Sequence, residues 1–393
     1  MTAVSFGDKP AAAIAGLALT KTAMIGKEKY PEAANTVIRN SYVDDLLDSF
    51  DDQSKARQIA SEIEELLGHC GFRIKEWVLS SEVAKKGPHE IGAPPTISQA
   101  GACSTKVLGI VWNPENDRLS FAARVNFSQK KRKIHTMPNL TENNLIQNVP
   151  AILTRRMILS QVNGIYDPIG LAVPFTVTAK ILLRKLTAEK FDWDDPISEE
   201  DRVKWMNFFL QMFAMEKITF HRSTKPQDAV GDPTLVVFSD ASEDAFGACA
   251  YARWEKKDGS YESRLIAAKS RLAPIKRITM PRLELNGALM AARIQQFIVS
   301  ELPSIQFRRK YFIVDSEIVR AMIQKESYGF KTFTGVRIGE IQATTEKRSG
   351  IGLRVRSTLL ILSSEVVRQV TLASTVSGRM DRHSSNSQRK NGR

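Results

Sequence analysis

Between residues 231 and 346, the spacing of apolar and polar residues predicts one α/β unit. Short apolar or alternating runs predict strands, and a longer stretch with helical spacing predicts a crossover helix. The expected order is strand 235–239, strand 245–254, strand 262–270, helix 282–299, strand 311–315 and helix 316–325. Three antiparallel strands, a helix and a parallel strand make a mixed sheet.

Three acidic residues occupy particular places in this unit. Asp240 follows the first apolar run, Asp315 ends the last one, and Glu284 lies in the helix that Pro281 opens. Either aspartate alone is more often a turn former or a helix N-cap. Glu284, however, shares its helix face with small residues three, four and seven positions further on, which would let the helix lie close to the sheet. We therefore predict that the three carboxylates converge on a pair of divalent cations.

The first 130 residues alternate between helical and strand-like patterns. Residues 41–47 favour a tight hairpin that exposes Asp44 and Asp45, although an Asp-Asp pair is usually just a solvated turn. The other expected elements are a buried helix over 11–19, an amphipathic helix from 51 to 68, a strand over 72–79, a loop over 80–105, and a hairpin of 106–112 and 119–127.

Residues 150–215 are predicted to be helical, with a turn at 166–170 between two helices. A stripe of aromatic and methionine residues predicts core packing and no ligand site; its members are Trp205, Phe208, Phe209, Met212 and Phe213. Residues 228–233 are expected to be the linker into the α/β unit, and residues 256–259 a turn between its second and third strands.

Composition adds a preference for a polyanionic partner. The chain has 393 residues, enough for two or three domains, with 42% hydrophobic and 25% charged residues. Its formal charge is +13 and its pI is near 9.6. Residues 346–393 carry ten Lys and Arg against three Asp and Glu, so about half of the excess lies there. The basic run 130–133 is more typical of a solvated linker than of a nucleic-acid contact.

Cysteine usage and hydropathy suggest an intracellular protein, cytoplasmic or nuclear. Cys70, Cys103 and Cys249 lie far apart without a Cys-x-x-Cys pair, which is typical of reduced core thiols. No apolar run approaches the ~20 residues that span a bilayer, and the N-terminus lacks the pattern of a signal peptide. We expect no membrane partner and no small-molecule cofactor.

Two classes of hydrolase lack their motifs. The chain has no Asp-Thr-Gly or Asp-Ser-Gly of an aspartic protease, and its five histidines are scattered without a Gly-x-Ser-x-Gly. The residues themselves leave two hypotheses: a metal-dependent reaction at the three carboxylates, and a nucleic-acid-binding protein without turnover.

Five segments together resemble the ribonuclease H domain of BEL/Pao-type retrotransposon polyproteins. They are 239–242 (SDAS), 245–251 (AFGACAY), 269–274 (KSRLAP), 281–285 (PRLEL) and 314–316 (VDS). The resemblance implies that Asp240, Glu284 and Asp315 are catalytic and hold Mg²⁺, with Mn²⁺ as an alternative. It implies an RNA:DNA hybrid or other nucleic acid as the partner. Residues 157–174 also match this family.

The hairpin at 41–47 adds a second resemblance. Residues 42–45 (YVDD) resemble the palm motif of reverse transcriptases, and residues 6–10 and 30–34 are similar to neighbouring Pao segments. The resemblance implies that Asp44 and Asp45 are catalytic, metal-binding carboxylates of a DNA/RNA polymerase. A polymerase also needs an upstream aspartate and fingers, so we expect no autonomous polymerase activity.

The resemblance ends near residue 346, where the family continues with a tryptophan-rich strand and a fourth carboxylate. A frameshift near 347 would explain this, with the missing aspartate near 360–361. We predict four regions: a partial palm and thumb-proximal region (1–128), a helical connection (129–230), a ribonuclease H-like mixed sheet (231–346) and a basic tail without evolved structure (347–393). The fold class is α/β and α+β, and we expect impaired hydrolysis.

Overall fold

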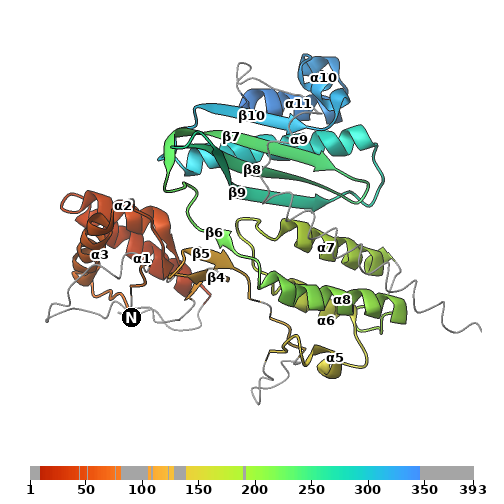
Figure 1. Ribbon diagram of the computed structural model, residues 1–393, viewed down its shortest axis with the longest axis horizontal. Helices are drawn as coiled ribbons and strands as arrows, with labels where there is room; N and C mark the ends of the chain where they lie inside the picture. The colour runs from red at the N-terminus through yellow and green to blue at the C-terminus, as the bar shows by residue number, and fades with distance from the viewer. Residues whose placement is uncertain are drawn as a thin grey trace, which may run out of the picture. The chain divides into compact units, whose positions relative to one another are not determined.

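The computed structural model describes most of the chain up to residue 345. The described residues are 9–43, 45–50, 52–75, 77–80, 105–107, 109–122, 124–127, 139–188 and 192–345. They form two compact units: one comprises residues up to 107 with 111–118, and the other comprises 108–110 and everything from 119 on (Figure 1). The predicted α/β and α+β class is confirmed. The expected loop at 80–105 lies almost wholly outside the described residues, and the basic run 130–133 and the tail 347–393 lie fully outside them.

The first unit is a small helical bundle with one hairpin. Its elements are α1 (Ala11–Gly26), α2 (Pro31–Asn40), β1 (Ser41–Tyr42), β2 (Asp45–Leu46) and α3 (Gln53–Gly68). Apolar side chains of the three helices form one core, including Val37 from α2 and Ile59 and Ile63 from α3. Asp52 caps α3 by accepting a hydrogen bond from the Ser54 backbone N–H. The amphipathic pattern from 51 to 68 therefore gives the predicted helix.

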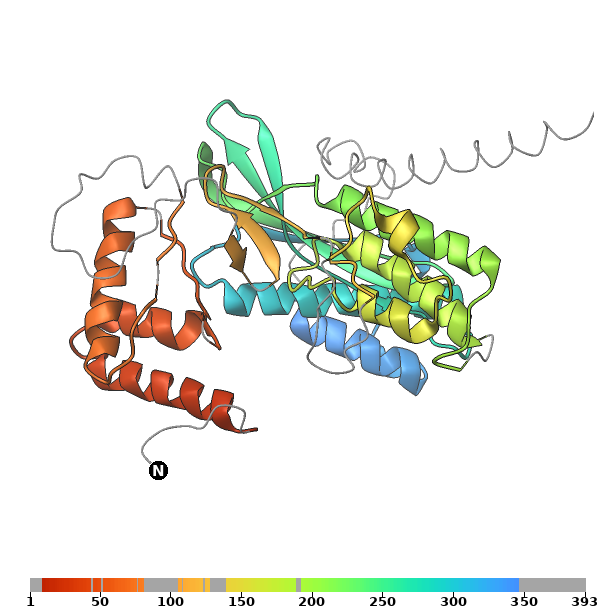
Figure 2. The same ribbon diagram turned by 90° about the horizontal axis from the view of Figure 1, so that it is seen from below.

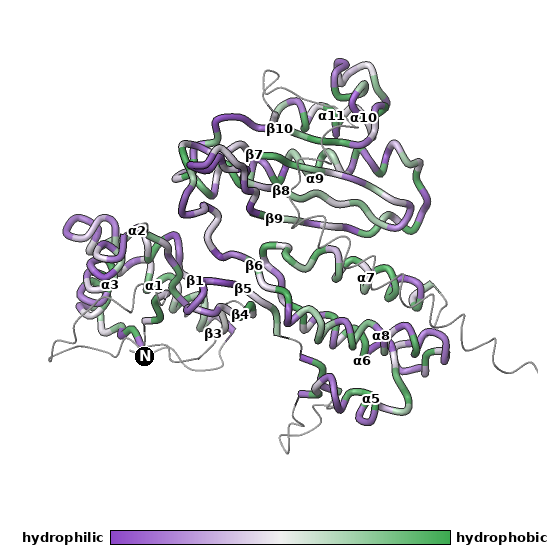
Figure 3. The backbone as a smooth tube through the Cα atoms, viewed as in Figure 1, coloured by the Kyte–Doolittle hydropathy of each residue, from purple (hydrophilic) through white to green (hydrophobic). Residues whose placement is uncertain are grey.

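Three predictions for this unit are wrong. Helix α1 forms and is rich in hydrophobic residues (Figure 3), but it is not buried: Leu17 is 70% exposed and only Thr22 and Ala23 are buried. Among the described residues of 72–79 there is no strand, only a single bridge position at Trp77. Cys70 is exposed and is not a core thiol. An apolar composition sets helix propensity, but burial depends on which surfaces the tertiary fold supplies.

Short strands follow where the chain passes between the units. They are β3 (Thr105–Val107), β4 (Ile110–Asn113) and β5 (Arg118–Ser120). The predicted hairpin turn at 113–117 is confirmed between β4 and β5, with Asp117 at a φ of 51°. The second strand is shorter than the predicted 119–127.

A helical region opens the second unit. It contains α5 (Leu145–Asn148), α6 (Arg155–Val162), α7 (Val173–Ala188) and α8 (Glu199–Met215), followed by the short strand β6 (Phe220–His221). The aromatic stripe of α8 is buried in one core with α6 and α7, as predicted; Trp205 is 1% exposed and Phe209 is fully buried. Ser198 caps α8 by accepting a hydrogen bond from the Asp201 backbone N–H.

The rest of the second unit is a four-stranded mixed sheet with helices. Its elements are β7 (Ala229–Ala241), β8 (Ala245–Lys256), β9 (Tyr261–Leu272), α9 (Met280–Glu301), β10 (Arg309–Val314), α10 (Glu317–Ile323), the 3₁₀ turn η1 (Ser327–Gly329) and α11 (Thr332–Thr344). The strand order is β10-β7-β8-β9, with β10 parallel to β7 and the other pairs antiparallel. Helix α9 packs on one face through a core that includes Leu235, Val237 and Ile294. Helix α11 lies beside α9 (Figure 2). The predicted mixed sheet is confirmed.

The predicted linker at 228–233 is wrong, because β7 already begins at Ala229. Gly231, at a φ of 64°, and the following Asp-Pro pair resemble a turn, but they form an irregularity inside the strand, between Val230 and Thr234. The turn predicted at 256–259 is confirmed, with Gly259 at a φ of 78°. In the described part of the chain, no helix is long and apolar enough to cross a bilayer. The domain boundaries near 128, 230 and 346 stay predictions.

Candidate functional site

Asp240 and Asp315 stand at the ends of two neighbouring strands. The parallel pair of β7 and β10 ends with Ser239 opposite Val314, and each aspartate is the next residue along its strand. Neighbouring strands are ~4.8 Å apart, so the two aspartates start from adjacent backbone positions. The side chains of Asp240 and Asp315 are both exposed at this end of the sheet. The predicted position of each aspartate at a strand end is therefore confirmed.

Helix α9 brings Glu284 toward the same edge. A Cβ atom added to Gly287 would lie 3.2 Å from the carbonyl oxygen of Asp240, so the helix contacts the backbone of β7 there. Glu284 lies nearly one helical turn before Gly287, and it is half-buried. The small face of this helix does allow the close approach that the sequence predicts.

The carboxylates themselves are not gathered into a metal-binding group. In the part of the chain that the structure describes, no three His, Cys, Asp or Glu side chains lie close enough together to hold a metal ion. The side chain of Asp240 instead accepts a hydrogen bond from the Ala241 backbone N–H, at 2.7 Å. Carboxylate oxygens are the ligands that Mg²⁺ prefers, so the residue types at this end of the sheet suit that ion. The convergence on a cation pair stays a prediction.

The hairpin with the other two predicted carboxylates forms as expected. Tyr42 on β1 pairs with Asp45 on β2, and Val43 in the turn has a φ of 54°. Asp45 is exposed, and Asp44 lies outside the described residues. The exposed tip is therefore confirmed for Asp45 alone, and the catalytic and metal-binding roles of both stay predictions.

A basic stretch next to Glu284 was missed by the sequence analysis. Between Ser263 and Leu283 there are six basic residues and no acidic one: Arg264, Lys269, Arg271, Lys276, Arg277 and Arg282. Lys269, Arg271, Lys276 and Arg277 are exposed. The strand register places Asp240 opposite Gly247, and Gly247 opposite Ser270. Lys269 and Arg271 are therefore the neighbours of Ser270, which lies in the cross-strand row of Asp240, and they are near the end of the sheet that carries Asp240. Because side chains alternate along a strand, Lys269 and Arg271 leave the sheet on the face opposite to that of Asp240.

Helix α11 adds a cation–aromatic cluster beside α9. The guanidinium of Arg337 lies 3.6 Å from the ring centroid of Phe333, and its Nε donates to the side-chain oxygen of Asn286 at 2.7 Å. Burial, together with repulsion from Arg293, lowers the pKa of Arg337. Arg293 in turn forms two hydrogen bonds with the Glu340 carboxylate and lowers the pKa of that group. These contacts fix α11 against the helix that carries Glu284.

The predicted turn at 166–170 covers the outer edge of the sheet. The Asp167 carboxylate accepts three backbone N–H bonds at 2.7–2.9 Å, from residues 170–172, and burial raises the pKa of Asp167 against the effect of these donors. The carbonyl oxygen of Ile169 accepts a hydrogen bond from the Ala268 backbone N–H of β9, at 2.8 Å. The turn therefore pairs with an edge strand that would otherwise expose its backbone groups.

Arg184 of α7 forms a second link to the sheet. Its guanidinium donates to the carbonyl oxygens of Asp244 and Ala273, each at 3.1 Å, and it also pairs with the Asp244 carboxylate. Asp244 lies between β7 and β8, and Ala273 follows β9 directly. The helical region therefore contacts the sheet at the end where β7 carries Asp240.

Comparison with known proteins defines the class of this domain. Residues 154–316 match the family model of the Pao retrotransposon-like RNaseH-like domain, so the predicted Pao-type ribonuclease H-like domain is confirmed for this part of the chain.

Solved structures give weaker likenesses to the whole chain. A foamy viral protease-reverse transcriptase in complex with dsDNA has 12% identity and a TM-score of 0.43; the match covers 89% of this chain and 58% of that one. Ribonuclease H1 from the archaeon Halobacterium salinarum NRC-1 has 15% identity and a TM-score of 0.17, over 30% of this chain and 80% of that one. The chain thus spans little more than half the length of the foamy viral protein. A search of curated proteins finds no match.

Proposed function

We propose that this chain binds an RNA:DNA hybrid and that Asp240, Glu284 and Asp315 form its hydrolytic site. The observation that carries the proposal is the adjacency of the two aspartates on parallel strands, with α9 packed against the backbone of Asp240. The exposed basic residues of β9 lie near the same end of the sheet and suit the phosphate backbone of a nucleic acid. The match of residues 154–316 to the model of the Pao retrotransposon-like RNaseH-like domain supports this reaction class.

Mg²⁺ is the ion we propose for these carboxylates, because it takes oxygen ligands and keeps several of its waters. A bound ion pair would activate a water molecule and stabilise the leaving oxygen. The expectation of impaired hydrolysis rests on the fourth carboxylate that the resemblance implies, whose expected position near 360–361 lies outside the described residues.

The exposed basic residues of β9, Lys269 and Arg271, favour a second candidate, a nucleic-acid-binding protein without turnover. These basic residues need no metal and no carboxylate cluster to hold phosphates. Removing one side chain that binds a phosphate should reduce the slope of log K against log salt by about one. Salt-dependent affinity without cleavage would therefore distinguish this candidate from the nuclease.

The deciding experiment is a cleavage assay on an RNA:DNA hybrid with Mg²⁺, using wild type, Asp240→Asn and Asp315→Asn. Asp232→Asn is the matched control, because Asp232 is an exposed aspartate on the same strand, at its other end. Cleavage that both site variants abolish and the control retains would support the nuclease. Cleavage that survives in both site variants would exclude this site.

Binding is measured in parallel without Mg²⁺, as a function of salt concentration. We expect a Lys269→Gln, Arg271→Gln double variant to lower the salt slope by about two, and Lys185→Gln on the exposed side of α7 to leave it unchanged. Binding with that pattern and no cleavage would favour the second candidate. The absence of both cleavage and salt-dependent binding would refute both candidates.

A further inference from the structure

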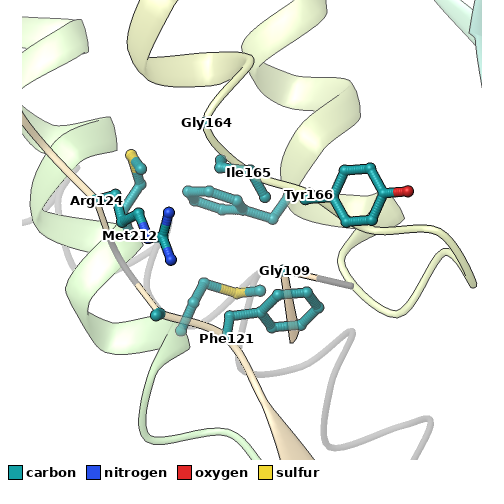
Figure 4. Close-up of a pocket in the computed structure, with 10 residues that line it drawn as sticks. Gly109, Phe121, Arg124, Gly164, Ile165, Tyr166 and Met212 are labelled. Atoms are coloured by element: carbon teal, nitrogen blue, oxygen red, sulfur yellow. The ribbon is translucent and has the colours of Figure 1, made fainter. Parts of the chain in front are cut away.

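A pocket with aromatic and methionine walls lies in the second unit, within its helical region. Its apolar lining includes Phe121, Ile165, Phe175, Met212 and Met215, which come from segments far apart in the sequence. The Tyr166 ring is turned away from this space, so Tyr166 lines the pocket only at its base (Figure 4). The cavity has about 70 Å³ of space, whereas a single water needs ~10–15 Å³. The pocket is partly open to solvent, so a ligand can reach it from outside.

The pocket walls are held in place by the surrounding core. Phe175 stacks on Phe208 with ring centroids 4.4 Å apart, and Met212 is buried in the same core. Gly109, at a φ of 79°, lets Tyr166 approach closely, since a Cβ at this position would lie 2.7 Å from the Tyr166 Cβ. A ligand would therefore meet a preformed site and would not have to order these side chains.

One positively charged side chain lines this pocket. Arg124 is the single charged residue of the lining, and Figure 4 shows its guanidinium turned toward the space between the apolar side chains. Arg124 is exposed, and within the described residues its side chain makes no hydrogen bond or ion pair. A guanidinium offers five N–H donors in a planar fork that matches a phosphate.

We propose that this pocket binds one unpaired nucleotide of a nucleic-acid strand, with the base between the aromatic side chains and its phosphate at Arg124. Aromatic and thioether groups stack on any base, and the side-chain lining offers no second charged group to select one. The site therefore recognises an unpaired end and not a particular sequence. This proposal rests on the proposed function only in taking nucleic acid as the partner.

The test compares a blunt RNA:DNA hybrid with the same hybrid carrying one unpaired 2-aminopurine nucleotide, whose fluorescence falls when the base stacks. We expect the overhang to improve affinity about tenfold and to lose fluorescence on binding. Arg124→Met, which changes an exposed side chain, and Ala122→Phe, which fills the pocket, should each remove both effects. Arg73→Met, which removes an exposed cation in the other unit, should leave both unchanged.

The possible outcomes of this test distinguish the pocket proposal from the proposed function. If the blunt hybrid binds but the overhang adds neither affinity nor a fluorescence change, the pocket proposal is wrong while nucleic-acid binding stands. If the hybrid does not bind, 2-aminopurine riboside monophosphate is tested alone: binding that requires Arg124 supports the pocket without the function, and no binding refutes the pocket. Equal effects in Arg124→Met and Arg73→Met would assign the gain to net charge and would also refute it.

Discussion

Replacing Arg184 with methionine should loosen the attachment of α7 to the end of the sheet that carries Asp240. The guanidinium donates to two carbonyl oxygens, those of Asp244 and Ala273, and pairs with the Asp244 carboxylate. The side chain of Arg184 is 22% exposed, whereas that of Asp244 is 49% exposed. Methionine keeps an apolar stem of similar length, so the substitution removes mainly the charge and its donors.

The expected loss of stability in Arg184→Met follows from these contacts. A hydrogen bond that involves a charged group contributes about 1.5–3 kcal/mol to stability. Because Arg184 is partly exposed, we take each of its hydrogen bonds to a carbonyl oxygen as about 1 kcal/mol. The half-exposed ion pair adds about 0–1 kcal/mol. We therefore expect Arg184→Met to lower the free energy of unfolding by about 2–3 kcal/mol. Arg184→Lys should recover only part of this stability, because an ammonium cannot span the same three acceptors.

Urea unfolding followed by tryptophan fluorescence measures this change, since Trp205 and Trp254 are both buried in the second unit. Lys185→Met, at the next and exposed position of α7, is the control and should change stability by less than about 0.5 kcal/mol. A double-mutant cycle with Asp244→Ala isolates the ion pair from the carbonyl bonds. If Arg184→Met changed the free energy of unfolding no more than the Lys185 control, the Arg184 hydrogen bonds would contribute nothing to stability. The proposed attachment of α7 to the sheet through Arg184 would then be refuted.

Three further predictions concern the turn and the cysteines. Gly170→Ala should prevent stable folding or lower the free energy of unfolding by about 3 kcal/mol or more. The residue has a φ of 91°, and the new Cβ would lie 1.9 Å from the Ala268 carbonyl oxygen. Thermal unfolding measures this change, and a wild-type melting temperature would contradict the prediction. Burial raises the pKa of Asp167, so the folded state keeps this proton to a higher pH, and the stability that Asp167 contributes should fall as the pH rises from about 4. Asp167→Asn lacks this term, so wild-type stability minus variant stability should shrink across that window in urea titrations; a difference that grows would reverse the sign. Burial raises the pKa of Cys249 to about 11, so alkylation at about pH 8, followed by mass spectrometry, should label exposed Cys70 first, and equal rates in the folded protein would be inconsistent with burial.

Local patterns predicted most of the helices and strands, because the formation of these elements depends on residues that are neighbours in the sequence. The spacing of apolar residues predicted α3 and α8, and continuous apolar runs followed by an acidic residue predicted β7 and β10. The failures occurred where tertiary contacts decide. Helix α1 has a core-like composition but an exposed surface, and the turn-like residues 231–233 continue a strand because β8 pairs on both sides of them.

The candidate site was predictable in its backbone but not in its side chains. Strand ends and helix spacing place Asp240, Glu284 and Asp315 at one edge, since the parallel register of two strands fixes their relative position. Rotamers decide whether the carboxylates meet, and sequence spacing does not encode them. The position of Lys269 and Arg271 near Asp240 follows only from the register of β8 and β9, and the pocket at Arg124 requires the packing of segments far apart in the sequence.

The turn at Asp167 and the bridge at Arg184 together explain why the helical region and the sheet form one unit. Strand β9 is an edge of the sheet, and without the Ile169 carbonyl and α7 part of its backbone would be open to pairing with other chains. The same strand carries Lys269 and Arg271 near the end of the sheet that carries Asp240. The helical region therefore stabilises the surface that we propose binds nucleic acid, and the match to the RNaseH-like domain model, over residues 154–316, covers residues of both parts.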